Sequence, residues 1–233
     1  MKNYIGRKQV QAGRMTMGEA YERGLLKEGV VPSEYEKDVD GYCVQYRGNQ
    51  SWCSVDLFEK TYRIAETPLD RMNIEYDEEV ERYEKGNKFV TSVNFDKLNY
   101  LARTLLSAQN ETQREYCYLL ADRIAQMSNK QVFPSNYDFG TAIKFLKAGG
   151  AIRRTGWDKG LLVVKQIPAS IKVDIIPKMQ SLPQIAKNIL MARNDAHIDY
   201  TNQMLIICPD GRANSWIPSC SDIFANDWEI VME

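Results

Sequence analysis

The chain has 233 residues, and its 30 basic and 31 acidic side chains leave a formal net charge of −1. This length accommodates one large domain or two to three small ones, and the near-neutral charge gives no global basic field for nucleic acid. No apolar run approaches the roughly 20 residues of a membrane-spanning helix. The first ten residues, MKNYIGRKQV, contain no apolar core of a signal peptide. We therefore expect a soluble globular protein with neither nucleic acid nor a membrane as a partner.

The cysteine and histidine content argues against metal and disulfide chemistry. The five cysteines are odd in number, and no two of them are spaced as C-x-x-C, so we expect free thiols in a reducing cytoplasm. The single histidine, His197, has no cysteine or carboxylate at metal-ligand spacing and leaves little room for histidine-based acid–base catalysis. The sequence therefore predicts no metal and no cofactor.

Residues 1–65 are predicted to form a small mixed α/β module. The segment KNYIGRKQVQAGRMTMGEA favours a strand followed by a short helix that begins near Thr16. Gly41 opens an apolar segment that turns at the polar tetrad RGNQ, which is typical of a β-hairpin. Ser54 is a suitable N-cap for a second short helix.

Residues 67–127 are predicted to form a helical hairpin or small bundle. The first helix should begin with Thr67 as N-cap, Pro68 at the first helical position and an acidic residue, Asp70, in the first turn. We expect a second helix, and then a third capped by Asn110. Each has one apolar stripe and a charged, solvated back, so each stripe must pack on a neighbour or on a copy of the chain. The stripes of the second and third helices contain Leu98, Leu101, Leu105, Cys117, Leu120, Ile124 and Met127.

A polar, aperiodic segment, residues 128–137, is predicted to link this part to a C-terminal domain at residues 137–233. There we expect a helix capped by Asp138, two strands around the glycine-rich turn of AIRRTGWDKG, and a helix capped by Ser181. A hairpin around the sequence Pro-Asp-Gly should follow, then a helical turn capped by Ser219 and a closing strand, DWEIV. The predicted fold class is α+β, with a small antiparallel sheet in the C-terminal domain.

No catalytic motif is present, but two segments of this domain are suited to binding a small nucleotide. Arg153 and Arg154 offer planar donors for phosphate, Gly156 allows close backbone approach, and Trp157 can stack on a base. The segment NSWIPSCSD adds a second indole, polar side chains and a capped helix start that favours anions; the candidate residues there are Asn214, Trp216, Ser219, Ser221 and Asp222. Equally, the indoles could fill a core and the arginines could lie on a strand face.

These segments resemble a known family. YDFGTAIKFLKAGGAIRRTGWDKG, followed by LLVVKQIP, SLP and SWIPSCSDIFANDWEIV, is similar to the second type of Thoeris anti-defence protein of phages. The resemblance covers residues 137–231. It implies a homotetrameric protein in the cytoplasm of the infected bacterial host. Such a protein binds a cyclic ADP-ribose isomer, or in some members a cyclic dinucleotide of the CBASS pathway, near subunit contacts without cleaving it.

Carried over position by position, the resemblance points to ten residues. Asp227 and Trp228 are expected to be structural. The candidates for ligand contact are Phe139, Gly140, Arg154, Gly156, Trp157, Trp216, Ser219 and Asp222. The sequence departs from the family pattern at Asp158, which could repel a phosphate, and at Pro218 and Cys220, where a lost amide could change base recognition.

The first two parts of the chain also have phage-like features. DGYCVQYRGNQSWCSVDLFEKTYR is similar to N-terminal segments of small phage proteins, and the helical part resembles a phage helical family first noted in a crAss-like phage. The leading hypothesis is a protein that sequesters a cyclic nucleotide immune signal. Two alternatives are a structural or interaction protein of phage with no small-molecule ligand, and an enzyme that degrades cyclic nucleotides.

Overall fold

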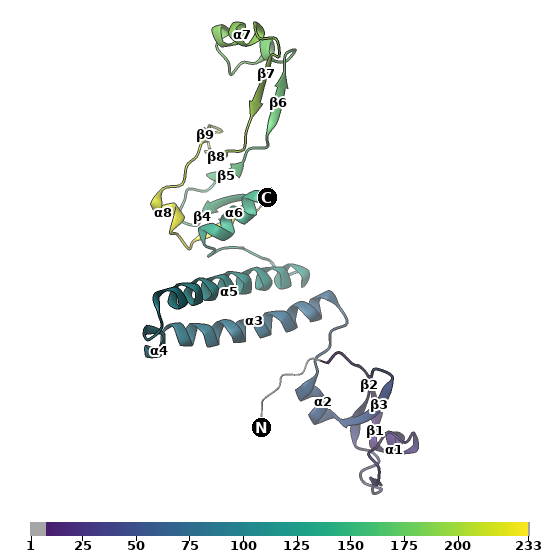
Figure 1. Cartoon of the computed structure of the whole chain (residues 1–233). Coiled ribbons are helices and arrows are strands. Elements are labelled where there is room, and N and C mark those ends of the chain that lie inside the picture. Colours follow the sequence, from purple (N-terminus) through teal and green to yellow (C-terminus); the bar gives the residue numbers. More distant parts are fainter. Residues whose placement is uncertain (1–7, 233) are drawn as a thin grey trace. The chain divides into compact units, whose positions relative to one another are not determined.

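A computed structural model describes residues 8–232 of the chain. It divides into two compact units, Met1–Ile74 and Glu75–Glu233, and the boundary falls within a helix. Helices and antiparallel sheets are combined in the chain, so the predicted α+β class is confirmed (Figure 1). The part of the predicted first strand that falls on residues 1–7 lies outside the described residues. The three-part division into domains stays a prediction.

The first unit contains an antiparallel sheet in the order β1-β2-β3 with two short helices. Helix α1 begins near Thr16 as predicted, and Thr16 caps it: its hydroxyl accepts from the Glu19 amide while the Glu19 carboxylate accepts from the Thr16 amide. Ser54 occupies the N-cap position of α2, but its side chain makes no capping bond. The elements are β1 (Gln11–Thr16), α1 (Met17–Glu22), β2 (Asp40–Tyr46), β3 (Asn49–Ser54) and α2 (Val55–Thr61).

Gly41 at the start of β2 leaves room for the indole of Trp52. A Cβ added at Gly41 would lie 2.4 Å from a carbon of that ring and 2.6 Å from the Cys53 carbonyl oxygen. The ring has little freedom to move, because its Nε1 donates to the Met15 carbonyl at 3.0 Å. A Cβ added at Gly13, on the neighbouring strand β1, would have no atom within 4 Å.

Substitution of Gly41 by alanine is therefore expected to lower the free energy of unfolding of this unit by about 1–3 kcal/mol, the usual result of overpacking. Hydrogen exchange of the β2 and β3 amides would measure it. Gly13→Ala is the matched control, because it adds the same methyl group to the same sheet in open space. Equal effects of the two substitutions would show that Trp52 does not fix the position of Gly41.

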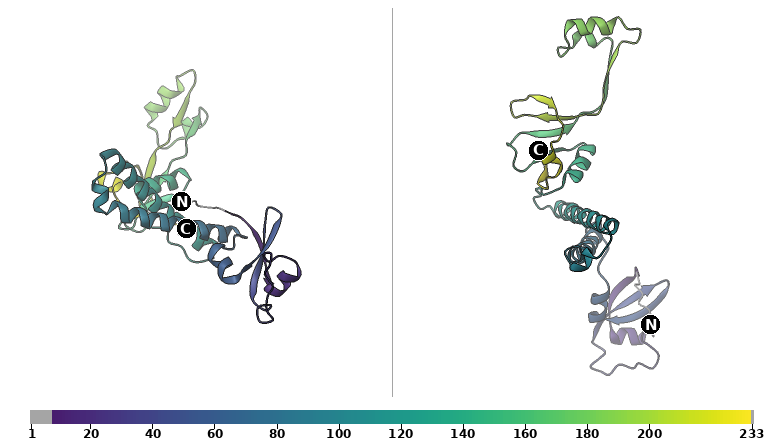
Figure 2. Two further views of the ribbon diagram at one scale, coloured as in Figure 1. Left: turned by 60° about the horizontal axis from the view of Figure 1, so that its bottom comes forward. Right: turned by 60° about the vertical axis from the view of Figure 1, so that its left-hand side comes forward.

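The second unit begins within a helical hairpin whose helices lie side by side (Figures 1 and 2). The cap at Thr67 is confirmed: its hydroxyl accepts from the Asp70 amide, and the Asp70 carboxylate accepts from the Thr67 amide. The hairpin contains α3 (Pro68–Val90), α4 (Val93–Asp96) and α5 (Tyr100–Met127). None of the helices in residues 8–232 is both long enough and apolar enough to cross a membrane.

The prediction of two helices separated by a cap at Asn110 is wrong, because a single helix, α5, runs through that position. The true N-cap is Asn99, whose side chain accepts from the Ala102 amide. Asn110 is buried within α5, where its amide nitrogen lies 3.5 Å from the Asn87 oxygen of α3. An added Cβ on Gly86 would lie 2.6 Å from Asn110 Oδ1. Asn110 thus occupies space that this glycine provides and is a packing residue.

The C-terminal sheet has the order β10-β4-β5-β8-β9 with antiparallel pairing throughout, and α6 packs on β4, β5 and β10. The predicted cap at Asp138 is confirmed, since its carboxylate accepts from the Thr141 amide at 2.6 Å. The predicted hairpin turn separates β8 from β9. The elements are α6 (Phe139–Lys147), β4 (Ala151–Arg154), β5 (Leu162–Lys165), β8 (Met204–Ile207), β9 (Ala213–Ser215), α8 (Cys220–Ile223) and β10 (Trp228–Ile230).

A two-stranded ribbon between β5 and β8 was not predicted. Strands β6 (Ala169–Lys172) and β7 (His197–Tyr200) pair antiparallel, and α7 (Gln184–Met191) lies at the end of the ribbon together with a 3₁₀ turn, η1 (Ile176–Lys178) (Figure 1). The N-cap position of α7 is Pro183, not the expected Ser181. Four-residue strands with mixed polar and apolar residues gave too weak an alternation to be recognised.

Candidate functional site

Four aromatic side chains from separate segments meet in the C-terminal domain; we call them the aromatic cluster. Phe139 comes from the start of α6, Trp157 from the β4–β5 turn, Trp216 from the end of β9 and Trp228 from β10. The centroid of the Trp228 ring lies 5.4 Å from those of Phe139 and Trp157 and 6.1 Å from that of Trp216. Trp157 and Trp216 pack edge-to-face against Trp228, a favoured arrangement of aromatic rings, and Phe139 packs against it at a tilt.

The cluster has a buried base and a partly exposed outer side. Trp228 is 0% exposed, and its indole Nε1 donates to the Asp222 carbonyl at 3.0 Å. Phe139, Trp157 and Trp216 are only partly buried. Trp216 is held in place through its backbone amide, which donates to the Met204 carbonyl at 2.8 Å. Trp228 is therefore a core residue, whereas the other three rings retain surface that faces solvent.

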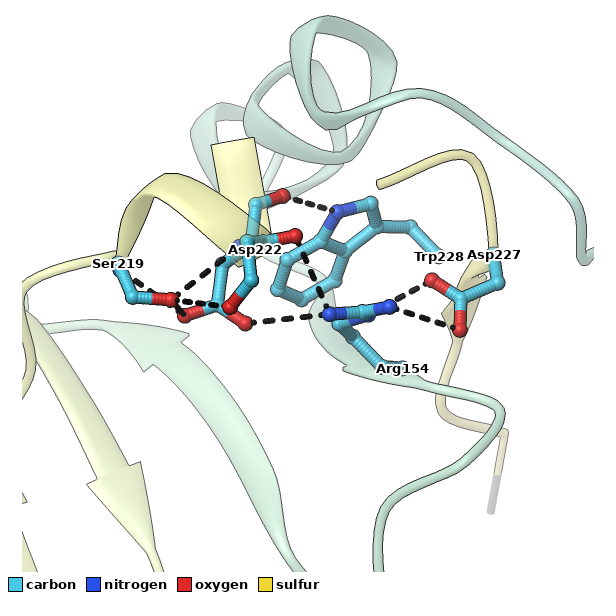
Figure 3. Close-up of polar contacts among 6 residues, drawn as sticks. Arg154, Ser219, Asp222, Asp227 and Trp228 are labelled. Atoms are coloured by element: carbon cyan, nitrogen blue, oxygen red, sulfur yellow. Dashed lines mark hydrogen bonds and ion pairs between the residues drawn. The ribbon is translucent and has the colours of Figure 1, made fainter. Parts of the chain in front are cut away.

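Arg154 joins β4 to the C-terminal segment through carboxylates that lie far away in the sequence (Figure 3). Its Nε and Nη2 donate to the two oxygens of Asp227 at 2.6 and 3.2 Å. Its Nη1 lies 3.5 Å from Asp222 Oδ1 and donates to the Ser221 carbonyl at 3.2 Å. The bond to Asp227 is the main factor that raises the pKa of Arg154. One guanidinium thus faces two carboxylates, and the group as a whole carries a net negative charge.

The helical turn α8 is closed by reciprocal capping between Ser219 and Asp222, as predicted (Figure 3). The Ser219 amide donates to Asp222 Oδ2 at 2.9 Å, and the Ser219 hydroxyl lies 2.7 Å from that oxygen and 2.7 Å from the Ser221 hydroxyl. Burial would raise the pKa of the Asp222 carboxyl, but hydrogen bonds from Ser219 and Arg154 outweigh burial and hold it below its ordinary value. Asp222 is therefore a carboxylate at neutral pH.

The structure brings most of the predicted site residues together, in two adjoining groups. Phe139, Trp157 and Trp216 belong to the aromatic cluster, while Arg154, Ser219, Ser221 and Asp222 form the polar group behind it. The bond from Trp228 to the Asp222 carbonyl connects the two groups.

Four predicted site residues lie outside both groups. Arg153 is paired instead with Glu229 on β10, Nε to Oε1 at 2.5 Å. Asn214 is exposed on the edge strand β9, where it pairs with Ile206 of β8. Gly140 and Gly156 are exposed, and Gly156 has no atom within 4 Å of an added Cβ.

Two exposed apolar residues beside the site were not among the predicted site residues. Ile217 is 85% exposed and Phe224 is 82% exposed, and they flank α8 on either side in the sequence. Single exposed apolar side chains are common on protein surfaces, and a contiguous apolar patch is what marks a contact surface. In the sequence, Ile217 directly follows Trp216, and Phe224 directly follows the capped turn. Neither residue belongs to a periodic apolar pattern, and this could have marked both as exposed.

The cysteine and histidine side chains are spread over separate elements of the chain. Among residues 8–232, no group of three or more histidine, cysteine, aspartate or glutamate side chains could hold a metal ion. The five cysteines are free thiols; Cys117 is buried in α5 and Cys220 is exposed on α8. The histidine, His197, lies on the ribbon strand β7.

Comparison with protein families gives an assignment for two parts of the chain. Residues 137–231 match the model of the Thoeris anti-defense 2-like domain, Tad2-like. Residues 66–126 match the model of a family described as Sequestin. No curated protein matches the chain. The aromatic cluster and Arg154 lie within the segment that is similar to the Thoeris anti-defense 2-like domain, which indicates a Thoeris anti-defence role.

Proposed function

We propose that the C-terminal domain binds a cyclic nucleotide immune signal and sequesters it without cleaving it. The observation that carries this proposal is the match of residues 137–231 to the Thoeris anti-defense 2-like domain, because the aromatic cluster lies wholly within the matched residues. The exposed sides of Trp157 and Trp216 are suited to stacking on a base, an interaction worth about 1–3 kcal/mol per base. The signal is a cyclic ADP-ribose isomer or a cyclic dinucleotide.

Capture that starves an immune effector has to be tight. A dissociation constant near 1 nM corresponds to about −12 kcal/mol, which a single stacking contact cannot supply. Two stacked rings, phosphate contacts and a preorganised pocket are needed together. Arg154 contributes no excess positive charge, because Asp222 and Asp227 both face it.

The charge balance around Arg154 favours an oligomeric site. A phosphate next to this net negative group would be repelled unless another cation neutralised it. We therefore propose that the chain assembles as a homo-oligomer, with a tetramer as the expected form, and that a second copy supplies the missing donors. The exposed side chains Ile217 and Phe224 provide apolar surface for such a contact.

The helical hairpin supports an extension of the same role. Residues 66–126 match a family whose name, Sequestin, refers to sequestration. We propose that both matched parts serve one anti-defence function in the cytoplasm of the infected bacterial host. Under the alternative function, a structural or interaction protein of phage, Ile217 and Phe224 would contact a protein partner and no small molecule would bind.

Calorimetry of the full chain with cyclic ADP-ribose isomers and cyclic dinucleotides tests the proposal. We expect tight binding of at least one of them, followed by release of chemically intact ligand when the complex is denatured by heat. Absence of binding to the whole panel would favour the interaction protein. Recovery of a linear or hydrolysed nucleotide would identify an enzyme instead.

A further inference from the structure

Helix α5 carries a stripe of residues, on a different side from Asn110, that contacts the C-terminal domain. Glu115, Tyr118, Leu119 and Asp122 follow the spacing i, i+3, i+4 and i+7, so they lie on one side of the helix. Asn110 lies roughly 80° or more around the helix from each of these residues and faces α3. The prediction that the charged backs of the helices are solvated is therefore wrong at Glu115, which is 3% exposed, and at Glu79, which is also buried.

Glu115 holds the residue at which α6 begins. Its Oε2 accepts from the backbone amide of Asp138 at 3.0 Å, and its other carboxylate oxygen accepts from Arg114 at 3.1 Å. Asp138 is the N-cap of α6 and accepts from the Thr141 amide through its own carboxylate. A buried carboxylate of α5 thus fixes the backbone of the residue whose side chain starts α6.

Asp122 holds the preceding residue in the same way. The hydroxyl of Tyr137 donates to Asp122 Oδ2, and the Tyr137 ring contacts Tyr118 with centroids 6.3 Å apart. Burial, followed by the bond to Asp122, raises the pKa of Tyr137 well above its ordinary value, so its hydroxyl is protonated at neutral pH and acts as the donor. The Tyr137 backbone exchanges two hydrogen bonds of 3.1 Å with Trp228 of the aromatic cluster.

Apolar packing and a backbone bond complete the contact. Leu119 packs against the core of the C-terminal domain. The Pro134 carbonyl accepts from the Ile230 amide at 3.0 Å. The predicted linker therefore ends earlier than expected, because the chain from Pro134 onward is bonded to β10.

We infer that Glu115 and Asp122 are positioning residues for the aromatic cluster: by fixing Asp138 and Tyr137 they set the placement of Phe139 and Trp228. The helical hairpin and the C-terminal domain then form one cooperative structure in which α5 supports the binding surface. The part of this inference that concerns ligand affinity rests on the proposed function, whereas the part that concerns ring placement does not.

Three variants of the full chain test this inference. In Glu115→Ala the Asp138 amide loses its buried acceptor, so we expect the melting temperature to fall by about 4–8 °C and the near-ultraviolet circular dichroism of the tryptophans to weaken. Glu115→Gln keeps an acceptor oxygen and is expected to restore the spectrum. Glu111→Ala is the matched control: it removes another carboxylate that pairs with Arg114, at 2.7 Å, and is expected to lower the melting temperature by about 2 °C or less.

A second pair of variants keeps the test valid if Glu115→Ala does not fold. Tyr137→Phe and Asp122→Asn each change the same hydrogen bond while the ring and the backbone stay in place. The combined variant is expected to weaken the spectrum no more than Tyr137→Phe alone does, because the two groups act as a pair. Additive losses would show that the pair does not position the cluster.

Calorimetry with the cyclic ADP-ribose isomer or cyclic dinucleotide that the wild type binds gives the functional readout. Glu115→Ala is expected to reduce affinity by about 2- to 30-fold, and Glu115→Gln to recover it. A fall in melting temperature with an unchanged tryptophan spectrum and unchanged affinity would overturn the inference. If the wild type binds none of these ligands, the proposed function fails while the spectra still decide whether Glu115 positions the rings.

Discussion

Replacement of Trp216 by alanine is expected to weaken capture of the cyclic nucleotide by about 5- to 150-fold, the loss of one stacked base, while the C-terminal domain stays folded. Trp216 is only partly buried. The neighbouring rings, Trp157 and Phe139, each contact Trp228 directly, so those contacts do not depend on Trp216. Removal of the ring therefore takes away binding surface more than it takes away core. Calorimetry gives the affinity, and far-ultraviolet circular dichroism gives the fold.

The matched control for this substitution is Phe224→Ala. Phe224 is an aromatic residue of the same C-terminal segment, 82% exposed, and it has no ring contact with the aromatic cluster in the described residues. We expect Phe224→Ala, measured under conditions where it keeps the oligomeric state of the wild type, to bind within about twofold of the wild-type affinity, because Phe224 is proposed to line the contact between copies and not the ring surface. If Phe224→Ala lowered the affinity more than Trp216→Ala did, Phe224 and not Trp216 would be the residue that stacks on the base.

Local signals in the sequence predicted the elements of the C-terminal domain well. The capped turn at Ser219 and Asp222, the cap at Asp138 and the hairpin around Pro209 each depend on residues within a few positions of one another, so short-range chemistry determines them. The same chemistry misled at Asn110, because asparagine is favoured at N-caps and yet can fill a helix contact opposite a glycine such as Gly86.

Contacts between residues far apart in the sequence could not be predicted from it. The partner of Arg154 is 73 residues away at Asp227, and no pattern within a segment identifies such a pair. For this reason Arg154 was predicted as a free donor for phosphate, whereas it is shared between two carboxylates. Glu115 illustrates the same limit, because its acceptor role toward Asp138 depends on how α5 meets another element.

These pairings also explain why the domain carries so many aromatic residues near its end. Trp228 fills the core and orients the Asp222 carbonyl, Asp222 caps α8 and faces Arg154, and Arg154 ties β4 to Asp227. The aromatic side chains with exposed surface are consequently mounted on a rigid base. Preorganisation of this kind reduces the entropy lost when a ligand binds, as the proposed tight capture of a nucleotide would require.

Trp228→Ala is expected to be the most destabilising substitution in this domain, at about 3–5 kcal/mol. The side chain is fully buried, and its loss would leave a cavity beneath Phe139, Trp157 and Trp216 and would remove the indole donor to the Asp222 carbonyl. Thermal unfolding should show a decrease in melting temperature of about 6–20 °C. Trp228→Phe, which keeps much of the ring volume but lacks the indole N–H, should fall between the wild type and the alanine variant. If Trp216→Ala proves as destabilising as Trp228→Ala, then Trp216 is core as well, and the base-stacking role assigned to it would have to be abandoned.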